Sequence, residues 1–133
     1  MTGLFKNNPR RKLRKLVKEK KYDEALKFGH EIEKSLKHDP DILFIIGTIY
    51  FIIGDAQKTI SYMNKTLEIG QFDIDALSIK ASIFLNQKKK SQVIECCEKI
   101  RVIDPKNKAL KEIDQELEKF YNLKNYIFIH HRS

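Results

Sequence analysis

The sequence contains little of what strand-rich or multidomain proteins need. Its 133 residues include 5 glycines, 3 prolines and no tryptophan, which is too little turn chemistry for many short strands. The length fits one domain, residues 1–133, so we do not expect an enzyme with separate cofactor and substrate domains. Hydrophobic residues nevertheless make up 41% of the chain, which is enough for a buried core. These proportions favour a protein built of helices.

The sequence also has few residues that point to catalysis or to metal binding. Its only two cysteines, Cys96 and Cys97, are adjacent, so their side chains would point in different directions on a helix. Neither a disulfide framework nor a metal pair follows, and a cytoplasmic location fits best. No HExxH, glycine-rich phosphate loop or GxSxG elbow is present. We therefore expect no catalysis, no metal and no cofactor, and we expect His30 and His38 on helix surfaces.

Positive charge is concentrated near the N-terminus. Residues 6–21 contain nine basic residues and one acid, a local net charge of +8 that equals the net charge of the whole chain. Leu13, Leu16 and Val17 fall on one side of a helix there, so this segment is expected to pack on a neighbour. Its basic face is either an ordinary solvated surface or a binding patch for an anionic partner. The patch comprises Arg10, Arg11, Lys12, Arg14, Lys15 and Lys18.

The sequence repeats itself with a period of 34 residues. The three units are residues 6–39, 40–73 and 74–107. One repeated position holds the large apolar residues Leu16, Tyr50 and Phe84, and another holds the compact residues Leu13, Gly47 and Ala81. A period of this length predicts stacked helix pairs, and small residues would let two helices approach closely.

Cap residues and apolar periodicity predict seven helices. Asn8 before Pro9 predicts a helix start, Asp39 before Pro40 marks a restart of the chain ahead of the next helix, and Gly54 and Gly70 predict helix ends. The expected helices are residues 9–20, 22–37, 42–53, 56–69, 73–86, 89–102 and a capping helix at 108–124. Residues 42–53 are almost all apolar, but twelve residues rise only about 18 Å, so we expect a buried central helix instead of a membrane span.

Two finer expectations concern the second and the last helix. The Asp-Pro pairs at 39–40 and 104–105 are 65 residues apart, three short of two full periods, which predicts a second helix about one turn longer than its counterparts. The capping helix should bury the stripe Leu110, Ile113, Leu117, Phe120 and Tyr121. It should expose Glu112, Asp114, Glu116 and Glu118. An apolar tail at 125–133, with His130 and His131, would follow.

The repeat resembles the tetratricopeptide repeat (TPR) family over residues 6–107. The resemblance is clearest in KYDEAL at 21–26, in Gly47 with Tyr50 and Gly54, and in Asp104 before Pro105. Leu43 and Leu77 stand where the family often has tryptophan, and Lys37 and Gln71 where it has a terminal proline. The resemblance implies an all-α fold, a right-handed superhelical solenoid of three helix-turn-helix repeats with a capping helix.

The resemblance also implies a function, because the first helix of each unit lines a concave groove in this family. The groove residues would be Arg10, Arg14, Val17, Phe44, Thr48, Phe51, Ser78, Ser82 and Leu85. Phe44 and Phe51 are either ordinary core residues or, with Ile52, lie on a helix face that has no neighbour in the repeat, and such a face usually has an occupant. We therefore expect a scaffold or adaptor that binds a peptide or an amphipathic helix of an unidentified protein.

Some chaperone-binding members of the family hold a partner's C-terminal carboxylate in a clamp of basic and amide residues. The matching positions here are Arg10, Arg14, Ile45, Asp75 and Ile79. Only Arg10 keeps the cationic role, so an apolar or acidic-amphipathic ligand is expected instead. Two other functions stay open: an adaptor for RNA or an anionic membrane through the basic helix, and a homo-oligomer assembled through the tail.

Overall fold

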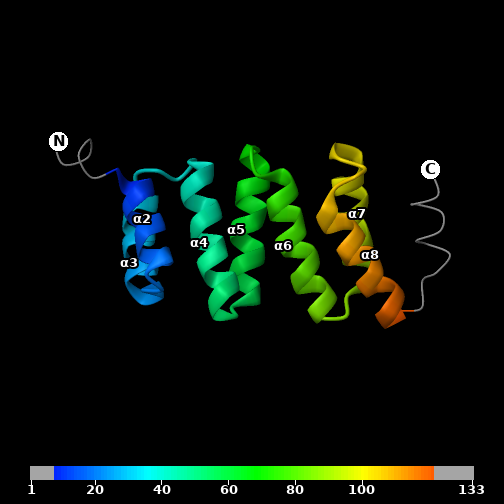
Figure 1. The fold of residues 1–133 in the computed structure, drawn as a ribbon. Coiled ribbons are helices and arrows are strands. Elements are labelled where there is room, and N and C mark those ends of the chain that lie inside the picture. Colours follow the sequence, from blue (N-terminus) through cyan, green and yellow to red (C-terminus); the bar gives the residue numbers. More distant parts are fainter. Residues whose placement is uncertain (1–7, 122–133) are drawn as a thin grey trace. The chain divides into compact units, whose positions relative to one another are not determined.

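The computed structural model describes residues 8–121, which form seven α-helices and no strand (Figure 1). The all-α prediction is therefore confirmed over this range. The chain divides into two compact units, Met1–Phe72 and Asp73–Ser133. The three 34-residue repeats and the solenoid remain predictions.

The first unit contains four helices, and most of their ends lie beside the predicted caps. They are α2 (Pro9–Lys18), α3 (Tyr22–Glu33), α4 (Pro40–Ile53) and α5 (Ala56–Ile69). The side chain of Asn8 accepts hydrogen bonds from the backbone N–H of Arg10 and Arg11, so the N-cap of α2 is confirmed. Gly54 after α4 and Gly70 after α5 have φ of 88° and 101°, values that glycine adopts without strain.

The predicted lengthening of the second helix is wrong. α3 has 12 residues, two fewer than α5, and it ends at Glu33 instead of Lys37. The backbone N–H groups of Ser35 and Leu36 both donate to the carbonyl of Ile32, at 3.2 and 2.9 Å, which tightens the last turn and stops the helix. The extra residues of the first unit therefore form the connection to α4.

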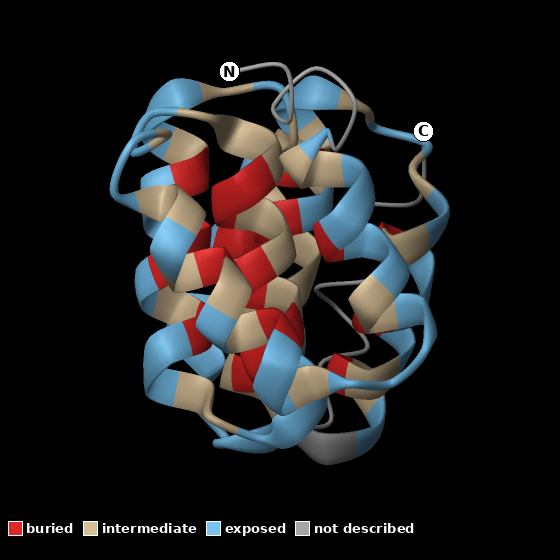
Figure 2. Cartoon of the chain, turned by 90° about the vertical axis from the view of Figure 1, so that its left-hand side faces the viewer, coloured by how far each residue is buried: buried red, intermediate tan, exposed pale blue. Residues whose placement is uncertain are grey.

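α4 is the central helix of the first unit, since it packs against α2, α3 and α5. The buried core residues of this unit include Leu13, Ala25, Ile42, Leu43, Ile46, Ile49, Tyr50 and Tyr62. In Figure 2 the buried residues, in red, gather between the helices. The prediction of a buried helix holds only up to Tyr50, because Ile52 and Ile53 are 46% and 48% exposed. None of the described helices is long and apolar enough to span a membrane.

The second unit contains α6 (Asp73–Asn86), α7 (Lys90–Ile103) and α8 (Lys108–Tyr121). Leu110, Ile113 and Leu117 of α8 are buried as predicted, and α8 contacts both α6 and α7. The expected exposure of Asp114 is wrong, since this residue is 1% exposed and pairs with Arg101 of α7 at 3.7 Å. The side chains of Phe120 and Tyr121 and the tail at 125–133 lie outside the described residues.

Cys96 and Cys97 are free thiols in the core of the second unit. Burial raises the pKa of both, and that of Cys97 reaches about 12. Thiols that stay protonated are poor nucleophiles and poor metal ligands. The pair thus contributes to packing between the helices of this unit.

Candidate functional site

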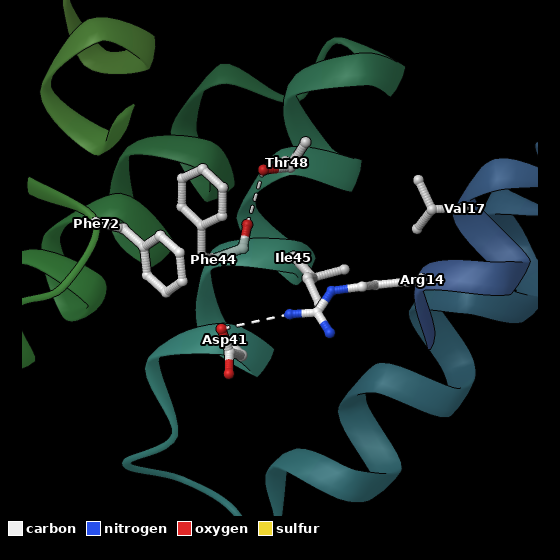
Figure 3. A pocket seen from close by; sticks show the side chains of 7 residues that line it. All are labelled: Arg14, Val17, Asp41, Phe44, Ile45, Thr48 and Phe72. Atoms are coloured by element: carbon white, nitrogen blue, oxygen red, sulfur yellow. Dashed lines mark hydrogen bonds and ion pairs between the residues drawn. The ribbon is translucent and has the colours of Figure 1, made fainter. Parts of the chain in front are cut away.

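A hollow of about 270 Å³ lies on the first unit between α2 and α4 (Figure 3). Its lining residues are Arg14, Val17, Asp41, Phe44, Ile45, Thr48 and Phe72. All but Phe72 come from α2 and α4, the first helices of the first two predicted repeats. Phe72 belongs to the short connection that follows α5. The hollow is therefore formed within a single unit.

The walls of the hollow are mostly apolar. The ring of Phe44 stacks on the ring of Phe72, with centroids 4.9 Å apart and planes 10° from parallel. The hydroxyl of Thr48 donates to the carbonyl of Phe44 at 2.8 Å and is thereby satisfied within its own helix, as Figure 3 shows. The prediction that Phe44 has no neighbour is wrong, because the ring of Phe72 covers one of its faces.

Two arginines of α2 pair with two aspartates at the N-terminus of α4, beside one edge of the hollow. Arg14 pairs with Asp41 at 3.4 Å, and the Nε of Arg10 lies 3.3 Å from the same carboxylate. Arg10 also pairs with Asp39, which caps α4 by accepting from the backbone N–H of Asp41 at 3.0 Å. Carboxylates at a helix N-terminus interact favourably with the helix dipole. These arginines therefore join α2 to the start of α4.

Of the predicted groove residues, Arg14, Val17, Phe44 and Thr48 line the hollow. Arg10 lies beside it through its ion pairs, whereas Phe51, which is 40% exposed at the end of α4, is not among its lining residues. Ser78, Ser82 and Leu85 lie on α6, in the second unit, and stay predictions.

Asp41 and Phe72 line the hollow although the sequence did not predict them, and Ile45 was predicted only as a clamp position. The pairing of Asp41 could have been predicted from the sequence, since a carboxylate in the first turn of one helix can pair with a strongly basic neighbouring helix. The place of Phe72 could not, because it lies in a connection where no helical period relates it to the hollow.

The six residues of the basic patch divide into three groups. Arg10 and Arg14 form the ion pairs with the α4 aspartates. The ammonium of Lys12 lies 4.4 Å from the ring centroid of Phe28 on α3, at cation–π distance. Arg11, Lys15 and Lys18 are exposed and form no ion pair with another described residue; we call these three the basic stripe.

A second polar group joins α3 to α4 and α5. The Nε2 of His30 lies 2.6 Å from the hydroxyl of Tyr50, and its Nδ1 lies 3.3 Å from Glu33. Tyr62 donates to the same Glu33 oxygen at 2.7 Å; burial, together with this hydrogen bond, raises the pKa of Tyr62. His30 is thus half-buried and bonded, not simply on the surface. His38 is exposed as expected, but it lies in the connection between α3 and α4 and not on a helix.

The polar side chains of the His30 group bond to one another. The hollow between α2 and α4 and the basic stripe are open to a ligand. Within residues 8–121 no group of three or more His, Cys, Asp or Glu residues is placed to hold a metal ion. No family model matches the chain, and no curated protein matches its sequence.

Proposed function

We propose that the protein is a non-catalytic interaction module, a TPR-like scaffold or adaptor that binds a peptide or helix of a partner protein. In this proposal its helix pairs stack as a right-handed superhelical solenoid, and the partner enters on the side of α2 and α4. The free thiols Cys96 and Cys97 support a reducing, cytoplasmic environment. The observation that carries the proposal is the apolar hollow on these two helices.

The size and lining of the hollow determine what it can hold. At about 270 Å³ it is slightly smaller than the usual binding site of a small molecule, and it suits one or two large side chains of a peptide. Val17, Phe44 and Ile45 offer apolar contact, and burial of one Leu or Phe side chain contributes about 1.5–3 kcal/mol. A partner segment would therefore anchor itself by a single bulky apolar residue.

Substitution of Thr48 tests this proposal directly. Thr48→Arg places a long charged side chain in the hollow while leaving the core of α4 intact, so it should block the anchor residue. Val102→Arg on α7 is the matched control, because Val102 is 85% exposed in the second unit. Circular dichroism should show equal helicity in the three proteins.

The measurement is quantitative affinity capture from cell extract followed by direct titration of the captured protein. A partner should be recovered with the wild type and with Val102→Arg, and Thr48→Arg should weaken its binding at least about ten-fold, or about 1.4 kcal/mol. Equal binding to all three proteins would show that the hollow is not the docking site.

A further inference from the structure

The positive charges in the first turn of α2 oppose the helix dipole, whereas Lys15 and Lys18 in its last turn interact favourably with it. The ten residues of this helix include six basic ones and no acid, and its first turn places Arg10, Arg11 and Lys12 at the positive end of the helix dipole. Arg11 and Lys15 are four residues apart, a spacing at which like charges repel. A partner that supplied negative charge would remove this repulsion.

The carboxylates of the unit itself relieve only part of this charge. Asp39 and Asp41 pair with Arg10 and Arg14, which face α4. No described carboxylate pairs with Arg11, Lys15 or Lys18. The basic stripe therefore keeps its full charge at the surface of the unit.

The basic stripe adjoins the hollow. Arg11, Lys15 and Lys18 follow one another at intervals of four and three residues, so they share one face of α2. At 3.6 residues per turn, Lys18 lies only about 40° around the helix from Arg14, a lining residue of the hollow. A ligand seated in the hollow and extending across α2 would thus meet the stripe directly.

We infer that the basic stripe binds the carboxylates of an acidic amphipathic segment whose apolar side chain occupies the hollow. This inference rests on the proposed function and names the chemistry of its partner. Such a segment complements both features at once, the apolar walls of the hollow and the positive charge of the basic stripe. Electrostatic attraction would also speed its association and make its affinity depend on salt.

The surroundings of the stripe favour a peptide over other anions. A membrane surface is bound by apolar side chains that project beside the cations, whereas Val17 and Phe44 form the walls of a hollow. Single-stranded RNA is bound by open aromatic faces, whereas one face of Phe44 is covered by Phe72. Neither anion would use the hollow and the stripe together.

The test uses the full chain and two designed helical peptides of about 16 residues, a length at which helices become stable in water. Both carry Leu and Phe along one face; the first carries Glu on the flanking positions, and the second carries Gln there. Binding is measured by fluorescence anisotropy at about 50 and about 300 mM NaCl, because this range shortens the reach of surface charges. Oligouridine and phosphatidylserine vesicles are titrated in parallel.

The stripe variant is Arg11→Glu, Lys15→Glu, Lys18→Glu. Its matched control is Lys27→Glu, Lys37→Glu, Lys106→Glu, which makes the same change of net charge at three other exposed lysines. We expect the Glu peptide to bind the wild type at least about ten-fold more tightly than the Gln peptide at low salt, and to lose most of that advantage at high salt. The stripe variant should also lose the preference for the Glu peptide, whereas the control variant should keep this preference within about two-fold of the wild type.

The outcomes separate the inference from the proposed function. If both peptides bind equally and Thr48→Arg weakens both, the hollow is a docking site but the stripe does not select acidic partners. If the Glu peptide binds the stripe variant as tightly as the wild type, or binds neither, the inference is wrong. Binding of oligouridine or vesicles that needs the stripe, without preference for the Glu peptide, would assign the stripe to that ligand instead.

Discussion

Gly47 of α4 lies so close to Tyr62 of α5 that a β-carbon on Gly47 would stand 2.9 Å from the Cβ of Tyr62. The terminal methyl of Met63 would be closer still. Real β-carbons hardly ever come within 3.0 Å of another heavy atom, so the two helices cross where only glycine fits. This close approach brings the core residues of α4 and α5 into contact, and it confirms the expected role of a small residue at position 47.

Replacement of Gly47 should destabilise the protein although other residues favour helices more. Gly47→Ala would gain up to about 1 kcal/mol of helix propensity, but we expect the overlap with Tyr62 and Met63 to outweigh it. Gly47→Leu should lower the free energy of unfolding by about 1–3 kcal/mol or more through overpacking. Urea denaturation measures both changes.

Gly29→Ala is the control for Gly47. Its new β-carbon would meet only side-chain atoms, the Cγ1 and Cδ1 of Ile46 at 3.0 and 3.3 Å, which can shift. Gly29→Ala should therefore cost less than Gly47→Ala. An unchanged or higher stability of Gly47→Ala would contradict the close crossing.

Asp39 has two roles that substitution can separate. Its carboxylate caps α4 through the N–H groups of Asp41 and Ile42, and it pairs with Arg10. Asp39→Asn keeps a capping side chain and should cost less than about 1 kcal/mol, since Arg10 is partly exposed. Asp39→Ala loses both and should cost about 1–2 kcal/mol. Thermal and urea unfolding measure the difference, and equal losses would show that the cap contributes little.

Asp114 should be much more sensitive to substitution than its neighbour Glu112. Asp114 is buried on α8 beside Arg101, whereas Glu112 is exposed on the same helix. Removal of one partner of a buried ion pair leaves the other charge poorly compensated, so Asp114→Ala should cost about 3 kcal/mol or more. Glu112→Ala should change the free energy of unfolding by less than about 0.5 kcal/mol. Comparable effects of the two changes would argue against burial of this carboxylate.

Cys97 should make the protein less stable at high pH. Burial, reinforced by Asp114, raises the pKa of Cys97 from 9.0 to about 12. Between these values the unfolded chain has lost the thiol proton and the folded chain keeps it, so the free energy of unfolding falls as pH rises. Below pH 9 the thiol of Cys97 is protonated in both the folded and the unfolded chain, so this loss of stability is absent.

The variant Cys97→Ala isolates this dependence. Below pH 9 the substitution should lower the free energy of unfolding by a constant amount, because it leaves a small cavity. Between pH 9 and about 12 the free energy of unfolding of the variant should fall less than that of the wild type. Cys96 and Tyr62, whose pKa values are also raised, are present in both proteins, so their contributions cancel. Parallel pH profiles of urea denaturation would contradict the effect.

Local signals were sufficient to predict most of the helix boundaries. Asn8 and Asp39 before prolines, together with Gly54 and Gly70, act on the backbone within a few residues, and the structure places helix ends beside each of them. The end of α3 was missed because no glycine or proline marks it and the turn after Glu33 depends on hydrogen bonds to Ile32.

Only part of the candidate site could be predicted from the sequence. The resemblance to the TPR family placed Val17, Phe44 and Thr48 in a groove, and these three residues do line the hollow. Helical periodicity could not show that Phe44 stacks on Phe72, or that Asp114 is buried, since period and composition describe each helix alone.

The sequence by itself determined where most of the helices of residues 8–121 begin and end and which residues of α4 are apolar, because capping and periodicity act over one or two turns. Only the tertiary structure decided that Arg10 and Arg14 pair with Asp39 and Asp41, while Arg11, Lys15 and Lys18 pair with no carboxylate of the described residues. The physical reason is that ion pairing depends on how neighbouring helices are rotated and crossed. That geometry follows from packing among residues far apart in the chain, such as Gly47 against Tyr62.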